Sequence, residues 1–363
     1  MITKDQVRAV AREFEFQGEV FEFAPYGNGH INDTYLVSCG DAGAPVRYIL
    51  QRINAQVFHD PIAVMHNIER VTAHLAAQVG GELDSARRLP RLVSTRDGRG
   101  WYTDAEGETW RAYSFVEGTR AYETVESAKL AFQAARAFGR FQQQLASLPP
   151  PRLLETIPNF HHTPKRFAAL KQAIDADVAR RVAGAGPEID FALAHEAITG
   201  VLLGANLPER TTHNDTKLNN VLFDQKTGEG ICVVDLDTVM PGLAPYDFGD
   251  MVRTSTSAAA EDERDLSKVG MQFEMFEALV RGYLDEAGVF LTNEEKEFLA
   301  FSGKLITFET GIRFLSDYLA GDTYFKVHRE GHNLDRCRTQ FKLVESIEQQ
   351  EEAMNRLVAS IAG

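Results

Sequence analysis

Residues 212–237 read THNDTKLNNVLFDQKTGEGICVVDLD, and this segment is the most informative part of the chain. Two short apolar runs flank a glycine-containing turn, which is the pattern of a β-hairpin. In an antiparallel hairpin, the residue that enters the first strand lies beside the residue that leaves the second. We therefore expect Asn220 and Asp235 at the same end of the hairpin, with Asp215 on the loop that leads into it.

These three side chains form a set of oxygen donors. Two carboxylates and an amide are the ligand types that a hard cation such as Mg²⁺ prefers. Transfer of a phosphoryl group needs little more from a protein than positioning, charge neutralisation and a carboxylate that orients the attacking hydroxyl. A capped turn before a strand is the alternative reading of the segment, but it does not explain why all three residues are present.

Length and composition indicate a folded protein with more than one compact unit. The 363 residues are enough for two lobes, and 44% of them are hydrophobic and 25% charged. Lys and Arg total 38 against 52 Asp and Glu, a net charge of −14. This surplus, with no basic cluster, disfavours nucleic acid and anionic membranes as partners. It is compatible with phosphate groups whose charge a metal ion neutralises.

The cysteines and the N-terminus bear on the cellular location. Cys39, Cys232 and Cys337 are far apart and form no C-x-x-C pair, so neither a disulfide framework nor a zinc ribbon is indicated. The first residues form a charged amphipathic segment, and no apolar run approaches the ~18 residues of a membrane span. We expect a cytoplasmic protein without a signal peptide.

The order of strand and helix patterns predicts an α+β fold. Residues 20–55 alternate in the period-two manner of strands, and residues 61–79 carry apolar side chains at helical spacing. A further strand pair is expected around 91–94 and 110–116. Long helical patterns follow from there to the end. We expect one lobe at residues 1–117 and a second at residues 118–363.

The motif His-x-Asp-x-x-x-x-Asn, followed by a hairpin that ends in Asp, resembles the catalytic and metal loops of the protein-kinase-like superfamily. The resemblance is strongest to its aminoglycoside phosphotransferase and choline kinase branch. It implies a small antiparallel-sheet N-terminal lobe, a larger and mainly helical C-terminal lobe that contains the catalytic hairpin, and ATP and Mg²⁺ as cofactors. It also implies that Asp215 is the catalytic aspartate, that Asn220 and Asp235 are metal ligands, and that His213 braces the catalytic loop.

Within that branch, four phrases resemble the N-acetylhexosamine 1-kinases. They are YGNGHIN at 26–32, THNDTKLNN at 212–220, DLDT with MPG at 235–242, and RFLSDYL at 313–319. The resemblance implies transfer of the ATP γ-phosphoryl group to the anomeric hydroxyl of N-acetylglucosamine or N-acetylgalactosamine. It also implies that His30, Arg313 and Tyr324, with Asp215, contact this amino sugar. An ion pair between Arg313 and Asp317, four residues apart on a helix, is the alternative for that segment.

Several residues of the first lobe are expected to bind the nucleotide. Gly27, Asn28 and Gly29 would cover the phosphates with backbone N–H groups, although an Asn-Gly turn between two strands needs no ligand. The other members of the expected nucleotide site are Gln51, Glu69, Phe115 and Val116.

The sequence departs from the protein-kinase pattern at the third strand. The phosphate-binding lysine expected there is replaced by Gln51, while Arg52 points to the other face. A neutral amide does not form the usual ion pair with a helix glutamate, for which Glu69 is the candidate. We expect Lys217 to supply the positive charge as part of the catalytic site, with a surface lysine as the alternative.

Two further aspartates, Asp247 and Asp237, lie near the motif and need a role of their own. Asp247-Phe248-Gly249 spells a metal-binding triplet, but it follows the hairpin by a dozen residues, so we expect Asp247 to brace the catalytic loop or cap a helix. Asp237 lies two residues beyond Asp235 and is expected as a secondary metal ligand.

Other functions stay open at this point. A kinase for choline, ethanolamine, homoserine or an aminoglycoside would share the metal site, and the acidic run at 261–263 would suit a cationic acceptor. Arg313 would oppose such a substrate. A catalytically dead nucleotide-binding module would explain the missing strand lysine, but it has no need for Asp215, Asn220 and Asp235 together.

Overall fold

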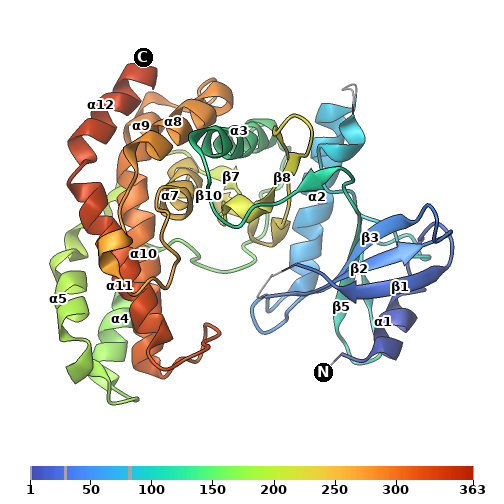
Figure 1. Ribbon diagram of the computed structural model, residues 1–363, viewed down its shortest axis with the longest axis horizontal. Coiled ribbons are helices and arrows are strands. Elements are labelled where there is room, and N and C mark those ends of the chain that lie inside the picture. The colour runs from blue at the N-terminus through green and yellow to red at the C-terminus, as the bar shows by residue number, and fades with distance from the viewer. Residues whose placement is uncertain (1, 28–30, 81–83, 363) are drawn as a thin grey trace.

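The computed structural model describes residues 2–27, 31–80 and 84–362. The chain forms two lobes, and Figure 1 shows the small sheet of the N-terminal lobe at the right and the helices of the C-terminal lobe at the left. The predicted combination of a small antiparallel sheet and a larger helical lobe is therefore confirmed.

The N-terminal lobe is built on a five-stranded antiparallel sheet of order β1-β2-β3-β5-β4. Its elements are α1 (Lys4–Ala11), β1 (Val20–Pro25), β2 (Asp33–Cys39), β3 (Val46–Arg52), β4 (Tyr102–Thr103) and β5 (Thr109–Ser114). The α1 helix packs Val7 and Val10 into a core with Phe14, Leu50 and Trp110. The prediction of a strand at 91–94 is wrong, because this segment forms only an isolated bridge between Leu92 and Tyr113.

Helix α2 (Pro61–Val79) lies between the two lobes (Figure 1). It begins where the Asp60 carboxylate accepts a hydrogen bond from the Ala63 N–H, with Pro61 in the first turn. Its apolar stripe, including Ile68 and Leu75, packs into the core of the C-terminal lobe. The boundary expected at residue 117 thus stays a prediction, because α2 precedes this residue in sequence but packs into the core of the C-terminal lobe.

The C-terminal lobe is a set of helices around this core. They are α3 (Ala128–Leu145), α4 (Thr163–Ala176), α5 (Gly186–Ala194), α6 (Val201–Gly204), α7 (Ala244–Ser255), α8 (Phe273–Ala287), α9 (Asn293–Glu297), α10 (Leu299–Ala320), α11 (His332–Glu348) and α12 (Glu351–Ala362). Helices α3 and α8 touch along their backbones at Gly139, where an added Cβ would lie 2.7 Å from the Tyr283 carbonyl oxygen. A side chain at this position would force the two helices apart.

Residues 212–237 form parts of two small sheets. Strands β8 (Val221–Asp224) and β9 (Gly230–Val233) form the predicted hairpin, and β6 (Thr119–Arg120) joins it at the other edge of β8. Strands β7 (Arg210–Thr212) and β10 (Met240–Gly242) pair with each other on either side of it in sequence. The loop between β7 and β8 is held in this way at both of its ends.

Within the described ranges, no helix is both long enough and apolar enough to cross a membrane. The three cysteines are buried and unpaired.

Candidate active site

The hairpin brings Asp215, Asn220 and Asp235 together as its register requires. Val221 pairs with Val233, and the Val234 N–H donates to the Asn220 carbonyl oxygen at 2.9 Å. The Asn220 amide donates to the Asp215 carbonyl oxygen at 2.9 Å and contacts its carboxylate at 3.3 Å. The predicted juxtaposition at one end of the hairpin is confirmed.

Asp247 clamps the loop that carries Asp215. It lies fully buried on α7 and accepts hydrogen bonds from the N–H groups of His213 at 2.8 Å and Asn214 at 2.7 Å. The Gln142 amide of α3 donates to the same carboxylate, and the Tyr283 hydroxyl of α8 donates to Gln142. The Asp-Phe-Gly triplet therefore braces the loop, as predicted, and does not face Asn220.

His213 ties the catalytic loop to the end of the hairpin. Its buried ring lies between Phe138 and Phe141 of α3, and its Nε2 is 3.0 Å from the Val234 carbonyl oxygen. Its Nδ1 accepts from the Asp215 N–H at 3.3 Å. This is the bracing position that the sequence resemblance implied.

Asp215 and Lys217 form an ion pair at the centre of the site. The Lys217 Nζ lies 2.9 Å from the Asp215 Oδ1, and both side chains are accessible to solvent. Burial alone would raise the pKa of Asp215, but the charge and hydrogen bond of Lys217 outweigh burial, so the pKa is lowered. The attraction of Asp215 raises the pKa of Lys217. At neutral pH this pair is ionised.

Asp235 lacks such a partner. Within the described residues no group donates a hydrogen bond to its carboxylate or forms an ion pair with it. Partial desolvation by the surrounding protein, with the nearby charges of Asp237 and Asp215, raises the pKa of Asp235 to about 6, although the side chain keeps access to solvent. Its backbone is in the left-handed region, with φ of 62°, so the carboxylate turns out of the strand direction. An uncompensated carboxylate beside the Asn220 amide fits a divalent cation.

A ready-made protein cage for a metal is absent from the part of the chain that the structure describes, since no three His, Cys, Asp or Glu side chains cluster suitably. Magnesium bound by one or two protein groups and completed by phosphates does not need one. The donor set of Asn220 and Asp235 is of that second kind.

Asp237 has a different task from the secondary ligand that was expected. One of its oxygens pairs with the buried Arg111 guanidinium of β5, and the other accepts from the Asn32 amide at 2.6 Å. Its charge is already balanced, so the structure favours Asp235 over Asp237 as the cation ligand. Asp237 instead joins the sheet of one lobe to the hairpin of the other.

Arg111 is the functional residue that sequence reasoning missed. It lies opposite Gln51 on the neighbouring strand, and its Nε donates to the Gln51 Oε1 at 3.0 Å. The Gln51 amide donates in turn to the Thr34 hydroxyl at 3.1 Å. The face that was expected to carry a lysine therefore carries an arginine from β5, held by Gln51 and Asp237.

The other residues expected at the nucleotide lie in three places. Gly27 follows β1 with φ of 76°, a conformation suited to glycine. Asn28 and Gly29, together with His30, which was expected at the sugar, lie outside the described residues. The Glu69 carboxylate accepts from the Gly100 N–H at 3.2 Å and does not pair with Gln51.

The connection after β5 contains the last two of these residues. The Phe115 ring lies against the Arg47 guanidinium at 4.3 Å, and the Thr119 hydroxyl donates to the Val116 carbonyl oxygen at 2.7 Å. Phe115 and Val116 thus lie in the segment that joins the two lobes.

Arg313 lies on α10, and Tyr324 lies in the loop that follows this helix. Arg313 rests between the rings of Phe160 and Phe325, at 5.4 and 5.7 Å. The alternative of an ion pair with Asp317 is wrong, because the Asp317 carboxylate accepts from the backbone of the following loop, including the Tyr324 N–H at 2.8 Å. Tyr324 is 59% exposed and so presents its ring to solvent.

A second arginine, Arg166 of α4, lies near this group. Burial and the neighbouring charge of Arg313 lower the pKa of Arg166. Neither guanidinium has an ion-pair partner within the described residues. Arg166 could not be predicted as part of this group, because it is far from Arg313 along the chain and belongs to no motif.

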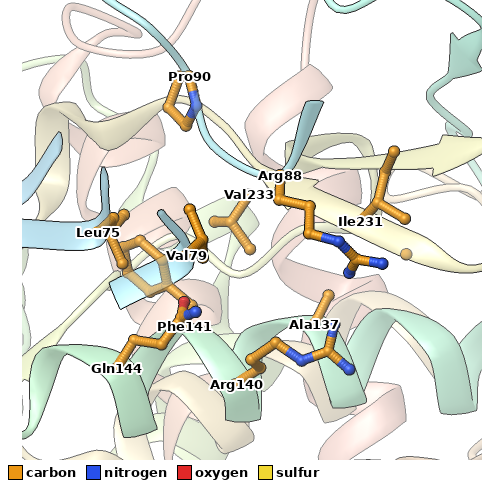
Figure 2. Close-up of a pocket in the computed structure, with 11 residues that line it drawn as sticks. Leu75, Val79, Arg88, Pro90, Ala137, Arg140, Phe141, Gln144, Ile231 and Val233 are labelled. Atoms are coloured by element: carbon orange, nitrogen blue, oxygen red, sulfur yellow. The ribbon is translucent and has the colours of Figure 1, made fainter. Parts of the chain in front are cut away.

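A small pocket between α2, α3 and β9 is separate from these residues. Figure 2 shows its lining, which includes Leu75, Phe141 and Val233 but none of the candidate site residues. We do not assign the reaction to it.

Comparison with solved structures supports the fold. The chain is similar to a microcompartment-associated aminopropanol kinase, with 19% identity, a TM-score of 0.58, and coverage of 97% of this chain and 99% of the other. It is also similar to a spectinomycin phosphotransferase solved with ADP and spectinomycin, with 14% identity, a TM-score of 0.62 and coverage of 97% and 99%. A choline/ethanolamine kinase family protein from Mesorhizobium loti gives 17% identity, a TM-score of 0.58 and full coverage of both chains, 100% each.

The sequence comparison reaches the family directly. The pattern of the phosphotransferase enzyme family matches residues 22–283. That range contains most of the sheet of the first lobe, the braced loop and the hairpin with its three oxygen donors. The chain belongs to the phosphotransferase enzyme family.

Proposed function

We propose that this protein is a kinase that uses Mg-ATP to phosphorylate a hydroxyl group of a small molecule. The observation that carries the proposal is the arrangement of Asp215, Asn220 and Asp235 at one end of the hairpin. The spectinomycin phosphotransferase that the chain resembles was solved with ADP, which supports the choice of nucleotide. All three residues are present, so a dead nucleotide-binding module is disfavoured.

Asp215 is proposed to orient the acceptor hydroxyl and to accept its proton during transfer. The braced loop presents this carboxylate to solvent beside Lys217. On nucleotide binding, Lys217 would exchange Asp215 for an oxygen of the transferred phosphoryl group, which frees the carboxylate for the acceptor. Magnesium, when bound by Asn220 and Asp235, would neutralise the phosphate charge that develops during transfer.

The first lobe is proposed to cover the nucleotide. Gly27, Asn28 and Gly29 would offer backbone N–H groups to the phosphates. Gln51 would act through Arg111, whose charge lies on the side of the sheet that the hairpin contacts. The remaining proposed nucleotide contacts are Glu69, Phe115 and Val116.

The acceptor is proposed to be an N-acetylhexosamine that is phosphorylated at C1, with His30, Arg313 and Tyr324 as its contacts. The proposal rests on the family phrases around these residues. A neutral acceptor is supported by the neighbouring arginines Arg166 and Arg313, neither of which has an ion-pair partner within the described residues. Hydroxyl and acetamide oxygens accept hydrogen bonds from guanidinium groups, whereas an ammonium group is repelled.

An amino alcohol is the second candidate, since the aminopropanol kinase and the choline/ethanolamine kinase family protein have similar folds. The acidic run that would suit such a cation is already occupied. Glu261 pairs with Arg253 at 3.2 Å, and Asp262 pairs with Arg329 at 3.2 Å and with His332 at 3.0 Å. These pairs reduce the negative charge available to a cationic substrate.

The test is a panel of acceptors offered with Mg-ATP: N-acetylhexosamines, amino alcohols, homoserine and aminoglycosides. We expect ADP release with N-acetylglucosamine or N-acetylgalactosamine, and phosphorus NMR should place the product phosphate on C1. The same sugars blocked as methyl glycosides should be inert. A phosphate on C6, or turnover with amino alcohols alone, would contradict the acceptor. A chain that releases no ADP with any acceptor would contradict the kinase assignment.

A further inference from the structure

The residue before the proposed base is held from two directions. Asn214 has φ of 66°, in the left-handed region, and its N–H donates to Asp247 at 2.7 Å. Its carbonyl oxygen lies 3.1 Å from the Nε2 of His161, a buried residue from the segment before α4. His161 is 53 residues from Asn214 in sequence and belongs to none of the motifs of the catalytic hairpin.

The other side of the His161 ring meets Glu309 of α10. The Nδ1 of His161 lies 2.8 Å from one oxygen of the fully buried Glu309, and the Thr163 hydroxyl donates to the other oxygen at 2.6 Å. The ring also packs against Phe160 and Tyr246. This packing leaves the imidazole one orientation, with a carbonyl at one nitrogen and a carboxylate at the other.

From this geometry we infer that His161 and Glu309 are a positioning pair for Asp215, acting through the Asn214 carbonyl. A carbonyl oxygen and an ionised carboxylate both accept hydrogen bonds only. The ring therefore has a hydrogen-bond acceptor at each nitrogen, the Asn214 carbonyl at Nε2 and the Glu309 carboxylate at Nδ1. Asp247 and His161 then hold the two backbone polar groups of Asn214, so the peptide that leads into Asp215 has no freedom to turn.

The charge state of Glu309 agrees with this arrangement. Burial alone would raise the pKa of the Glu309 carboxyl, but the charge and hydrogen bond of His161 outweigh it and lower the pKa. Glu309 is also one helical turn before Arg313 on α10. The pair thus links the catalytic loop to the helix that carries a proposed acceptor contact, and in this respect the inference rests on the proposed function.

A second histidine of this lobe provides a matched control. The Nδ1 of His195 lies 2.7 Å from the Phe191 carbonyl oxygen, and its Nε2 lies 3.3 Å from Glu348. It makes the same two kinds of contact but does not touch the catalytic loop. His195→Ala therefore removes the same kinds of contact at a more exposed place, away from the catalytic loop.

The experiment is a double-mutant cycle between His161 and Asp215. We expect His161→Ala to lower kcat by about 10²-fold, since a displacement of about 1 Å at a reacting group has that effect, and to leave the KM for ATP within about twofold. In the Asp215→Asn background, His161→Ala should cause no further loss. His195→Ala should leave kcat unchanged. Losses that multiply in the double variant would overturn the inference.

Glu309→Gln tests the same pair with little change in volume and serves if His161→Ala does not fold. It should lower kcat in the same direction and show the same absence of further loss with Asp215→Asn. Hydrogen exchange of the amides at 214–216 should quicken in both variants and not in His195→Ala. Unchanged exchange there would also contradict the inference.

The outcomes separate this inference from the proposed function. If the wild-type protein releases no ADP with any acceptor, the proposed function fails. If Asp215→Asn keeps full turnover, the proposed role of Asp215 fails, and the positioning role fails with it. If Asp215→Asn is inactive but His161→Ala and Glu309→Gln keep wild-type kcat, only the positioning role fails.

Discussion

Asp215 and Asp235 are both aspartates of one site, but their surroundings assign them different work. Asp215 is paired with Lys217, whereas Asp235 has no ion-pair partner within the described residues. We expect Asp215→Asn to lower kcat by about 10²–10⁴-fold with nucleotide affinity nearly intact, because it removes a proton acceptor. We expect Asp235→Asn to weaken magnesium-dependent ATP binding and to recover partly at high magnesium or with manganese.

Titration of magnesium against activity and nucleotide affinity checks both variants. Asp247→Asn is the control, because a buried loop brace should lose thermal stability without any change in metal dependence. If Asp247→Asn showed the metal-rescuable defect and Asp235→Asn did not, the choice of metal ligand would be wrong.

Lys217 and Gln51 differ in what they offer a phosphate. The Lys217 ammonium needs only to leave Asp215, while the Gln51 amide is bound to Thr34 and Arg111. We therefore expect Lys217→Ala to lower kcat more than Gln51→Ala does. Steady-state kinetics at saturating ATP give the ranking. The reverse order would mean that the strand supplies the main phosphate contact.

The site residues that the sequence could predict are those with short separations. Asp215, Asn220 and Asp235 are linked by one loop and one hairpin, so spacing and strand pairing determine where they meet. Arg111 could not be predicted, because its partner Asp237 is 126 residues away and the pairing depends on how the lobes dock. The alternative of an Arg313–Asp317 ion pair was wrong because the Asp317 carboxylate binds the backbone of a loop whose course no periodicity describes.

Gly249 of the Asp247-Phe248-Gly249 triplet lets α7 pack closely against α10. An added Cβ at Gly249 would meet the Ser302 carbonyl of α10 and lie 2.8 Å from the Ile306 Cγ1. We expect Gly249→Ala to lower the free energy of unfolding by about 1–3 kcal/mol through overpacking. Chemical denaturation measures this change.

Gly204→Ala at the end of α6 is the matched control, since nothing lies within 4 Å of its Cβ position. It should be neutral or slightly stabilising. Equal losses in the two variants would show that the contact between α7 and α10 does not control the effect.

The contact between the lobes depends on the Arg111–Asp237 pair. Both side chains are buried, so Asp237→Asn would leave an uncompensated guanidinium inside the protein. We expect a loss of about 3–5 kcal/mol in the free energy of unfolding. Arg52→Ala, which removes exposed pairs on the same sheet, should cost only about 0–1 kcal/mol. A small loss in Asp237→Asn would mean that the lobes are held mainly by other contacts.

Composition and the order of strand and helix patterns were sufficient to predict two lobes, because the strands of the first sheet all precede the long helices of the second lobe, α2 apart. They were not sufficient for α2. Its apolar stripe marks a buried helix, but the stripe does not say which core it enters, and Ile68 and Leu75 enter that of the C-terminal lobe.

The chain of hydrogen bonds from Tyr283 through Gln142 and Asp247 to the catalytic loop crosses three helices, α8, α3 and α7. Because these helices form the body of the lobe, the loop has no independent melting step available to it. Heating should therefore abolish catalysis and tertiary structure in a single cooperative transition. Reactivation on cooling should likewise follow refolding of the whole lobe, so residual activity would report directly on the fraction of native molecules.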